Sequence, residues 1–311
     1  MVKKVELSIV LPVCDEAGNL PELFSRLAAV LRPLTNDYEL ILIDDGSRDD
    51  SWRLISEAAR SEPRIKALRF SRNFGQMAAL TAGLDLAMGD AIIMMDADLQ
   101  HPPELLPRLI EKWRGGAEIV NTIRHETGNG NLFKRLTARV FYRLINLFSG
   151  LTLPAGAADF RLLGRKAADS LKGFREQARF LRGLVNWLGF RQEFIEYRVD
   201  KRPSGKSKYS LRKMAAFSLD GIFSFSVLPL RLAAALGLLV AAASFIYLGY
   251  TLYIRFFTDR AIEGWASVLG ALLFIGGLQL AFLGLIGEYI GRIYEEAKQR
   301  PLYIVRERIG Q

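Results

Sequence analysis

Residues 91–101 read Ala-Ile-Ile-Met-Met-Asp-Ala-Asp-Leu-Gln-His, an apolar run that ends in two carboxylates one residue apart. A short apolar run bounded by polar residues is typical of a strand buried inside a parallel sheet. Two carboxylates at this spacing, just beyond such a strand, can share a hard cation such as Mg²⁺ or Mn²⁺. An isolated Asp-x-Asp pair is also common in turns, so the surrounding strands decide how Asp96 and Asp98 are interpreted.

The same pattern recurs along the first half of the chain. Apolar runs predict four strands, at Leu7–Val13, Glu39–Ile43, Ile65–Phe70 and Ala91–Met95. Helical patterns separate or follow them, at about 19–31, 50–60, 75–88 and 102–113, the last opening with prolines. Alternating strands and helices predict an α/β fold with a mostly parallel, Rossmann-like sheet. In such sheets the binding crevice lies beyond the carboxyl ends of the strands.

The first two predicted strands also end in acidic residues. Cys14-Asp15-Glu16 follows one, and Asp44-Asp45-Gly46-Ser47 ends the other. We expect these segments to meet Asp96 and Asp98 at one edge of the sheet. Asp45 could bind ribose hydroxyls or base-edge donors there, although an Asp-Gly-Ser run is also a common turn. The segment from Pro12 to Glu16 could either cap the following helix or line a base pocket.

Two segments near the carboxyl end predict membrane-spanning helices. No charged residue occurs from Leu232 to Ile254 or from Ala266 to Gly287. Each run has about 20 residues, which is enough to cross ~30 Å of hydrocarbon. Buried core helices are the alternative, but uncharged runs of about 18 residues or more are unusual in soluble domains. The predicted organisation is a domain at 1–205, a juxtamembrane segment at 206–230, a two-helix hairpin within 231–288 and a tail at 289–311.

Basic residues flank the two predicted spans unevenly. Those before the first span are Lys201, Arg202, Lys206, Lys208, Arg212, Lys213 and Arg231, and those after the second are Arg292, Lys298, Arg300, Arg306 and Arg308. The connecting loop, 255–264, holds only Arg255 and Arg260. By the positive-inside rule, the first domain and both termini face the cytoplasm of a multi-pass protein in the cell membrane. The net charge of +9 therefore indicates an anionic membrane surface or a phosphorylated ligand rather than nucleic acid.

Residues 132–148 predict a basic amphipathic helix, with Phe133 and Leu136 on one face and Lys134 and Arg135 largely outside it. Such a helix can lie in the membrane interface, and packing on the sheet is an equally good explanation. The N-terminal residues predict no signal peptide. One cysteine, Cys14, excludes an intrachain disulfide. The sequence has no Cys/His zinc spacing, P-loop or Gly-x-Ser-x-Gly elbow.

Four motifs in this order resemble those of family 2 glycosyltransferases of the GT-A fold. They are Ser8-Ile9-Val10-Leu11-Pro12 with Glu16 and Asn19, Asp44-Asp45-Gly46-Ser47, Asp96-Ala97-Asp98-Leu99-Gln100-His101-Pro102, and Asp159-Phe160-Arg161. The most similar branch is the polyprenyl-phosphate glycosyltransferases, which include dolichol-phosphate mannose synthase and bactoprenol glucosyltransferases. The resemblance continues through residues 202–209, the two spans and residues 287–292.

The resemblance implies a role for each motif. The nucleotide-sugar donor would be held by Pro12, Glu16, Asp45, Asp96 and Arg124. A Mg²⁺ or Mn²⁺ ion would be bound by Asp96, Asp98 and Gln100. The lipid phosphate would be received by Arg202, Lys206 and Lys208. A basic cluster beside a span can also bind anionic headgroups, and both roles are compatible.

Asp159 resembles the candidate base of the family and, with Asp98, is a predicted catalytic residue. A phosphomonoester acceptor has a second pKa of about 6, so at neutral pH it needs little deprotonation. Asp159 could therefore orient the acceptor or the basic residues instead of taking a proton. A salt bridge to Arg161 or a turn is the purely structural alternative.

Together with the resemblance, these features predict metal-dependent transfer of a sugar, with inversion, from a nucleotide-sugar to undecaprenyl phosphate at the cytoplasmic face. The residues do not name the sugar, and the resemblance to the two-span bacterial branch favours UDP-glucose as the donor. GDP-mannose or a UDP-modified pentose is an alternative donor. A processive polysaccharide synthase typically has more spans and a Gln-x-x-Arg-Trp motif, where this chain has Gln177-Ala178-Arg179-Phe180-Leu181. The intact acidic motifs disfavour a non-catalytic lipid-binding scaffold. Assembly of the spans into a homo-oligomer is compatible with the sequence, and no nucleic-acid partner is expected.

Overall fold

The computed structural model describes residues 5–126, 156–199, 223, 226–257 and 264–310. The chain divides into two compact units, one formed by residues 1–221 with 301–311 and the other by residues 222–300. The helix predicted at 132–148 and the predicted acceptor residues Arg202, Lys206 and Lys208 lie outside the described residues.

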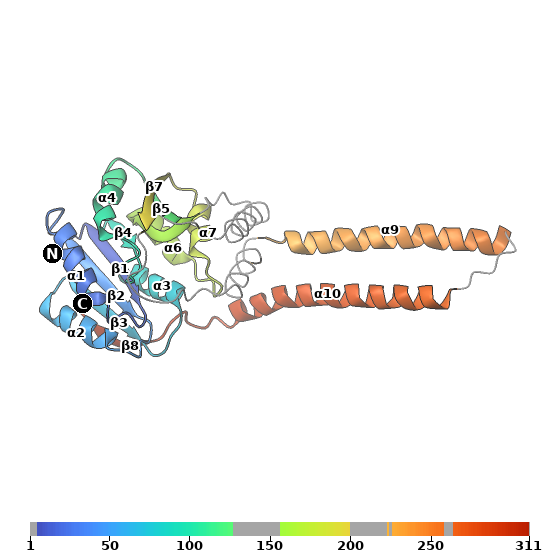
Figure 1. Ribbon diagram of the computed structural model, residues 1–311, viewed down its shortest axis with the longest axis horizontal. Coiled ribbons are helices and arrows are strands. Elements are labelled where there is room, and N and C mark those ends of the chain that lie inside the picture. Colours follow the sequence, from blue (N-terminus) through green and yellow to red (C-terminus); the bar gives the residue numbers. More distant parts are fainter. Residues whose placement is uncertain (1–4, 127–155, 200–222, 224–225, 258–263, 311) are drawn as a thin grey trace. The chain divides into compact units, whose positions relative to one another are not determined.

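The first unit is built on an eight-stranded sheet with the order β7-β5-β6-β4-β1-β2-β3-β8 (Figure 1). The strands are β1 (Leu7–Val13), β2 (Tyr38–Asp44), β3 (Ile65–Phe70), β4 (Ala91–Met94), β5 (Ile119–Glu126), β6 (Ala157–Gly164), β7 (Gln192–Val199) and β8 (Val305–Ile309). Parallel pairs join β1 to β2 and β4, β2 to β3, and β5 to β7. Antiparallel pairs join β6 to β4 and β5, and β8 to β3. The predicted parallel strands are confirmed, and the antiparallel pairs make the sheet mixed.

Helices cover both faces of this sheet. They are α1 (Leu20–Leu31), α2 (Ser51–Ser61), α3 (Gln76–Leu86), α4 (Leu106–Arg114), α6 (Arg165–Gly173) and α7 (Leu181–Trp187), with a 3₁₀ turn, η1 (Pro103–Leu105). Apolar side chains of α1, α2 and α4 share a core with the odd-numbered residues of β1. Val10, on the opposite face of β1, packs against α3, where a Cβ on Gly83 would lie 2.1 Å from its Cγ1. Close packing therefore requires glycine there.

The fourth predicted helix begins later than expected. Pro102 has an extended backbone, with ψ of 122°, and the 3₁₀ turn η1 precedes α4. The α-helix itself starts at Leu106, with Pro107 in its first turn. Proline is tolerated there because the first amides of a helix have no partner within it.

The C-terminal segment is part of the sheet and not the separate tail that we expected at 289–311. Strand β8 lies antiparallel to β3, with Ala67 opposite Ile309 and Phe70 opposite Val305. Trp52 Nε1 donates a hydrogen bond to Glu307 at 3.2 Å. The sequence of β8, Val-Arg-Glu-Arg-Ile, lacks an apolar run because the strand lies at an exposed edge, where charged side chains are common.

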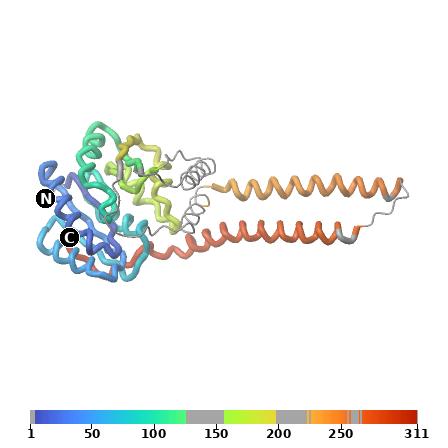
Figure 2. The backbone as a smooth tube through the Cα atoms, viewed as in Figure 1, coloured from blue at the N-terminus to red at the C-terminus, as the bar shows by residue number. Residues whose placement is uncertain are grey.

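The second unit contains two long apolar helices, α9 (Leu228–Phe257) and α10 (Trp265–Ala297), shown in orange to red in Figure 2. Within them, Leu228–Ile254 and Ser267–Ala297 are long and apolar enough to cross a membrane. The predicted spans fall within these helices, and α10 continues beyond Gly287. Pro229 lies in the first turn of α9, where it is compatible with the helix.

Candidate functional site

The loops that follow β1 and β2 brace one another at the carboxyl edge of the sheet. The amide of Asp15 donates to Ser47 Oγ at 3.0 Å, and the amide of Arg48 donates to Asp15 Oδ1 at 2.7 Å. The amide of Glu16 donates to Ser51 Oγ at 2.9 Å. These bonds bring the segment from Pro12 to Glu16 beside the Asp44-to-Ser47 turn, as the strand order predicts.

Asp45 anchors the loop between β3 and α3. Its carboxylate, 3% exposed, accepts the amide of Phe74 at 2.6 Å and that of Gly75 at 2.9 Å. Burial raises the pKa of Asp45, and the two amide hydrogen bonds oppose that rise. Gly75 has φ of +97°, a conformation that favours glycine. Both carboxylate oxygens therefore have protein donors, so a direct contact with a nucleoside stays a prediction.

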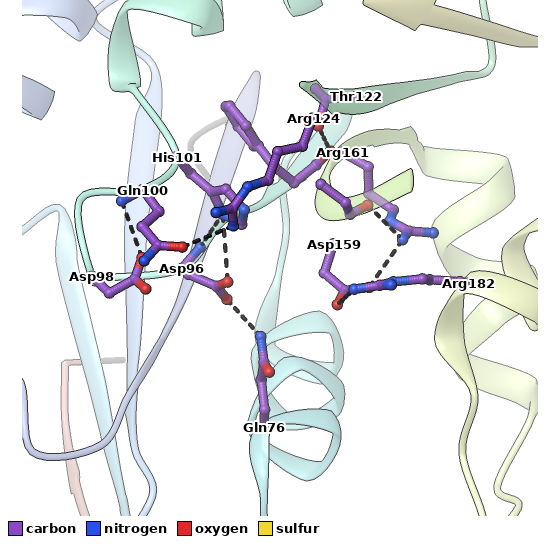
Figure 3. A network of polar contacts seen from close by, with 12 residues as sticks. Gln76, Asp96, Asp98, Gln100, His101, Thr122, Arg124, Asp159, Arg161 and Arg182 are labelled. Atoms are coloured by element: carbon purple, nitrogen blue, oxygen red, sulfur yellow. Dashed lines mark hydrogen bonds and ion pairs between the residues drawn. The ribbon is translucent and has the colours of Figure 1, made fainter. Parts of the chain in front are cut away.

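Asp96 lies at the centre of the network in Figure 3. Gln76, the first residue of α3, donates to Asp96 Oδ1 at 2.6 Å. The amide of Asp96 donates to His101 Nδ1 at 2.9 Å, which places the proton of the neutral imidazole on Nε2. The His101 ring stacks on Phe160 with 5.1 Å between centroids. Burial raises the pKa of Asp96, and the carboxylates of Asp159 and Asp98 raise it further.

Asp98 and Gln100 form a tight turn beside this network. The amide of Gln100 donates to Asp98 Oδ1 at 3.1 Å. Leu99 between them has φ of +62°, a left-handed conformation that is unfavourable for leucine and is found mostly where surrounding contacts enforce it. Arg124 Nη1 on β5 donates to Gln100 Oε1 at 2.8 Å. The structure thus brings together Asp96, Asp98, Gln100 and Arg124, and their roles in binding a metal and the donor stay predictions.

The residues of this cluster fit a hard cation. No group of three or more His, Cys, Asp or Glu side chains among the described residues could hold a metal ion alone. The protein offers the carboxylates of Asp96 and Asp98 and the amide oxygen of Gln100, and Mg²⁺ commonly takes its other ligands from phosphate and water. A cation would also offset the carboxylate repulsion that raises the pKa of Asp96.

Asp159, on β6, is held by two arginines. Arg182 donates to both carboxylate oxygens, through Nε at 3.0 Å and Nη2 at 2.8 Å. Arg161 Nη2 donates to Asp159 Oδ1 at 3.1 Å, and the Asp159 side chain is 12% exposed. Burial alone would raise the pKa of Asp159, but the charges and hydrogen bonds of Arg182 and Arg161 lower it to about 2. Asp159 is therefore ionised throughout the neutral range.

Comparison with known proteins identifies the family. Residues 8–172 match the family described as Glycosyl transferase family 2, and residues 228–293 match the GtrB C-terminal hairpin. The chain is 45% identical over 310 residues to the uncharacterized glycosyltransferase YkcC of Bacillus subtilis, covering 100% of this chain and 96% of the relative. The chain belongs to glycosyltransferase family 2.

Two further proteins are similar to this chain. The bactoprenol glucosyl transferase of Shigella phage SfX is 38% identical over 304 residues, covering 98% of this chain and 100% of the relative. Among solved structures, glucosyl-3-phosphoglycerate synthase from Mycobacterium tuberculosis aligns with a TM-score of 0.46 and 20% identity, over 70% of this chain and 78% of that chain. The match to family 2 and the mostly parallel sheet confirm the GT-A fold and glycosyltransferase class predicted from the motifs.

Sequence analysis of this family 2 glycosyltransferase missed three residues of the site. Gln76 belongs to no motif. The sequence predicts only that it lies near the start of a helix at about 75–88. Arg182 lies 23 residues beyond its partner Asp159, and only the fold brings the two together. His101 belongs to the Asp96-to-Pro102 motif, so its neighbours could have indicated a role in supporting Asp96.

Proposed function

We propose that this glycosyltransferase moves a sugar from a nucleotide-sugar, with UDP-glucose favoured, to undecaprenyl phosphate. The transfer is metal-dependent, inverts the anomeric centre and takes place at the cytoplasmic face of the cell membrane. Similarity to the bactoprenol glucosyl transferase of Shigella phage SfX supports the lipid acceptor and the glucose donor.

The electrostatic state of Asp159 is the observation that carries the proposal. A sugar hydroxyl is a poor nucleophile without a base, and an efficient base has a pKa near the working pH. Asp159 has a pKa of about 2, and both its oxygens accept hydrogen bonds from arginine. It is therefore a weak base, and a nucleophile that arrives already ionised suits this site better. A lipid phosphomonoester has that property.

The proposed step is a single displacement. A phosphate oxygen of the acceptor attacks the anomeric carbon as the bond from that carbon to the nucleotide diphosphate breaks. The diphosphate leaves with the bonding electron pair, no proton is transferred, and an α-linked donor gives a β-linked lipid product. A cation held by Asp96, Asp98 and Gln100 would neutralise charge on the departing diphosphate.

Within the protein, Asp159 is proposed to hold Arg182 in place rather than take a proton. Arg182 is 24% exposed, and its bidentate pair with Asp159 fixes the guanidinium plane. Pro12, Glu16 and Asp45 remain proposed donor-binding residues. The lipid phosphate is proposed to meet Arg202, Lys206 and Lys208.

The membrane assignment rests on two independent features. The helices α9 and α10 each contain a segment long and apolar enough to span a bilayer, and basic residues are concentrated outside the loop that connects them. Residues on both sides of these helices also belong to one compact unit. This supports the proposed hairpin, in which two crossings return the chain to the side of the membrane where it began.

The experiment is a product assay with detergent-solubilised protein, Mg²⁺, undecaprenyl phosphate and a panel of UDP- and GDP-sugars. Mass spectrometry should identify a lipid carrying one hexose and one phosphate, formed from UDP-glucose. Undecaprenol, which lacks the phosphate, is the matched control acceptor and should give no product. Transfer to undecaprenol at a similar rate would contradict the requirement for a charged acceptor.

A further inference from the structure

Two buried polar atoms beside the site have no hydrogen-bond partner in the part of the chain that the structure describes. They are Tyr197 Oη and Arg124 Nε. Tyr197 is 6% exposed, so water does not replace the missing partner freely. Buried polar groups are nearly always hydrogen-bonded, because leaving one unpaired is unfavourable. Two such atoms in one place indicate a site that a ligand completes.

The two residues are direct neighbours in the sheet. Arg124 on β5 is the register partner of Tyr197 on β7, and these strands are parallel. Paired residues on adjacent strands project their side chains to the same face. This is the face where Arg124 also donates to Gln100 Oε1, so Tyr197 stands next to the predicted cation site.

The surroundings of the phenol keep it a hydrogen-bond donor. Its ring packs edge-on against His101 and Phe160, with centroids 6.4 and 6.2 Å away. Burial raises the pKa of Tyr197 to about 12; the charge of Arg124 and the nearby Thr122 hydroxyl oppose that rise, and the charges of Asp96 and Asp98 add to it. The Thr122 hydroxyl donates to the carbonyl of Phe160 and forms no hydrogen bond with Tyr197 Oη. The Tyr197 hydroxyl is thus protonated at neutral pH. An arginine N–H and a phenol O–H on paired residues of adjacent strands can both donate to one acceptor oxygen.

We propose that Tyr197 Oη and the Arg124 guanidinium together bind a phosphoryl oxygen, which makes Tyr197 a further binding residue of the transfer site. A negatively charged oxygen fits because Arg124 supplies a permanent charge, and because a phosphate bound here would share the cation of the neighbouring carboxylates. The inference rests on the proposed function. The oxygen belongs either to the diphosphate of the donor or to the phosphate of the acceptor.

The test compares Tyr197→Phe with Tyr38→Phe. Each substitution removes one hydroxyl from a buried tyrosine, and Tyr38 lies at the start of β2 with its ring against Arg64. Calorimetry with Mg²⁺ gives the dissociation constants of UDP and uridine, and nanodisc kinetics gives KM for undecaprenyl phosphate. Loss of a hydrogen bond to a charged group should weaken the affected ligand about 10-fold or more.

Two outcomes support the proposal and identify the source of the oxygen. If Tyr197 binds the donor diphosphate, Tyr197→Phe weakens UDP but not uridine. If it binds the acceptor phosphate, KM for undecaprenyl phosphate rises while UDP binding is unchanged. Calorimetry measures UDP binding without turnover, so it does not depend on the identity of the acceptor. If Tyr197→Phe weakens UDP binding but the wild type does not glycosylate undecaprenyl phosphate, the role of Tyr197 in donor binding stands and the proposed acceptor is rejected.

Two other outcomes would overturn it. Ligand constants equal to those of Tyr38→Phe would make Tyr197 an ordinary core aromatic. A lower Tm for ligand-free Tyr197→Phe than for the wild type would show that the hydroxyl has a partner within the protein, because removing an unpaired buried hydroxyl should leave Tm unchanged or raise it.

Discussion

Asp96 and Asp159 lie in the same site and have opposite electrostatic surroundings. Burial and neighbouring carboxylates raise the pKa of Asp96, whereas two arginines overcome burial at Asp159 and lower its pKa to about 2. A bound cation would therefore stabilise the ionised form of Asp96, whereas Arg182 and Arg161 already stabilise the ionised form of Asp159. This difference agrees with the proposed roles, in which Asp96 binds a cation and Asp159 positions basic groups.

Replacing Asp98 by Asn should reduce turnover at least about 100-fold, because the change removes a full charge from a cation site. The protein should stay folded, since the amide oxygen of Asn can still accept the Gln100 amide hydrogen bond. Turnover is measured with radiolabelled donor and folding by circular dichroism. Asp169→Asn on the surface of α6 is the control and should retain activity. Near-normal turnover in Asp98→Asn would contradict the proposed role of Asp98 in metal binding.

The pH dependence of kcat/KM for the acceptor should reflect ionisation of the acceptor phosphate and not of Asp159. The pKa of Asp159 is about 2, below its ordinary value of 3.8. Its contribution to the free energy of unfolding is therefore complete above pH 3.8 and is lost only as pH falls through about 2. The acid limb of kcat/KM for the acceptor should instead lie near the second phosphate pKa of about 6. An acceptor phosphonate, whose second pKa is higher, should move this limb to higher pH.

Asp96 provides the competing explanation for an acid limb. Its raised pKa means that protons compete with a cation as pH falls. A limb that shifts with Mg²⁺ concentration but not with the acceptor would assign it to Asp96 and contradict the prediction.

At the scale of elements, the strands with apolar runs were predictable and the strands without them were not. The bounds of β1 and β3 agree with the apolar runs at Leu7–Val13 and Ile65–Phe70. Strands β6 and β7 were missed because they mix charged and apolar residues, and β8 because it is short, charged and at an edge. The motif residues could be placed in advance since strand ends position them. Partners such as Arg182 depend on contacts between distant segments.

Removing β8 should destabilise the first unit. Tyr303 stacks on Phe70 with 5.0 Å between centroids and donates a hydrogen bond to Asp85 at 2.9 Å. Truncation after Leu302 would expose Phe70 and leave the edge of β3 unpaired. We expect Tm to fall by at least about 2 °C, as for a loss of ~1 kcal/mol or more in a unit of this size. Differential scanning fluorimetry measures this, with deletion of Gln311 alone as the control. An unchanged Tm would show that β8 adds little to the stability of the sheet.

At the scale of the whole molecule, the hairpin model predicts which loop is outside the cell. A cysteine at position 259, introduced as Asp259→Cys in a Cys14→Ser background, should react with a membrane-impermeant maleimide in intact cells. A cysteine introduced as Arg60→Cys, at an exposed position of α2, should react only after the cells are opened. Protection of position 259 in intact cells, with labelling after lysis, would contradict the hairpin.

The pairing of β8 with β3 also dictates an order of events during synthesis. Chains are made from the amino end, so the last strand leaves the ribosome after both apolar helices have been translated. Until then β3 is an open edge, the kind of surface that joins other chains and aggregates. If the proposed hairpin spans the bilayer, β8 can pair with β3 only in a chain whose two helices have both crossed, because a single crossing would leave β8 on the opposite side. Under the proposed topology, pairing of β8 with β3 would therefore distinguish correctly inserted chains from chains inserted with one helix only.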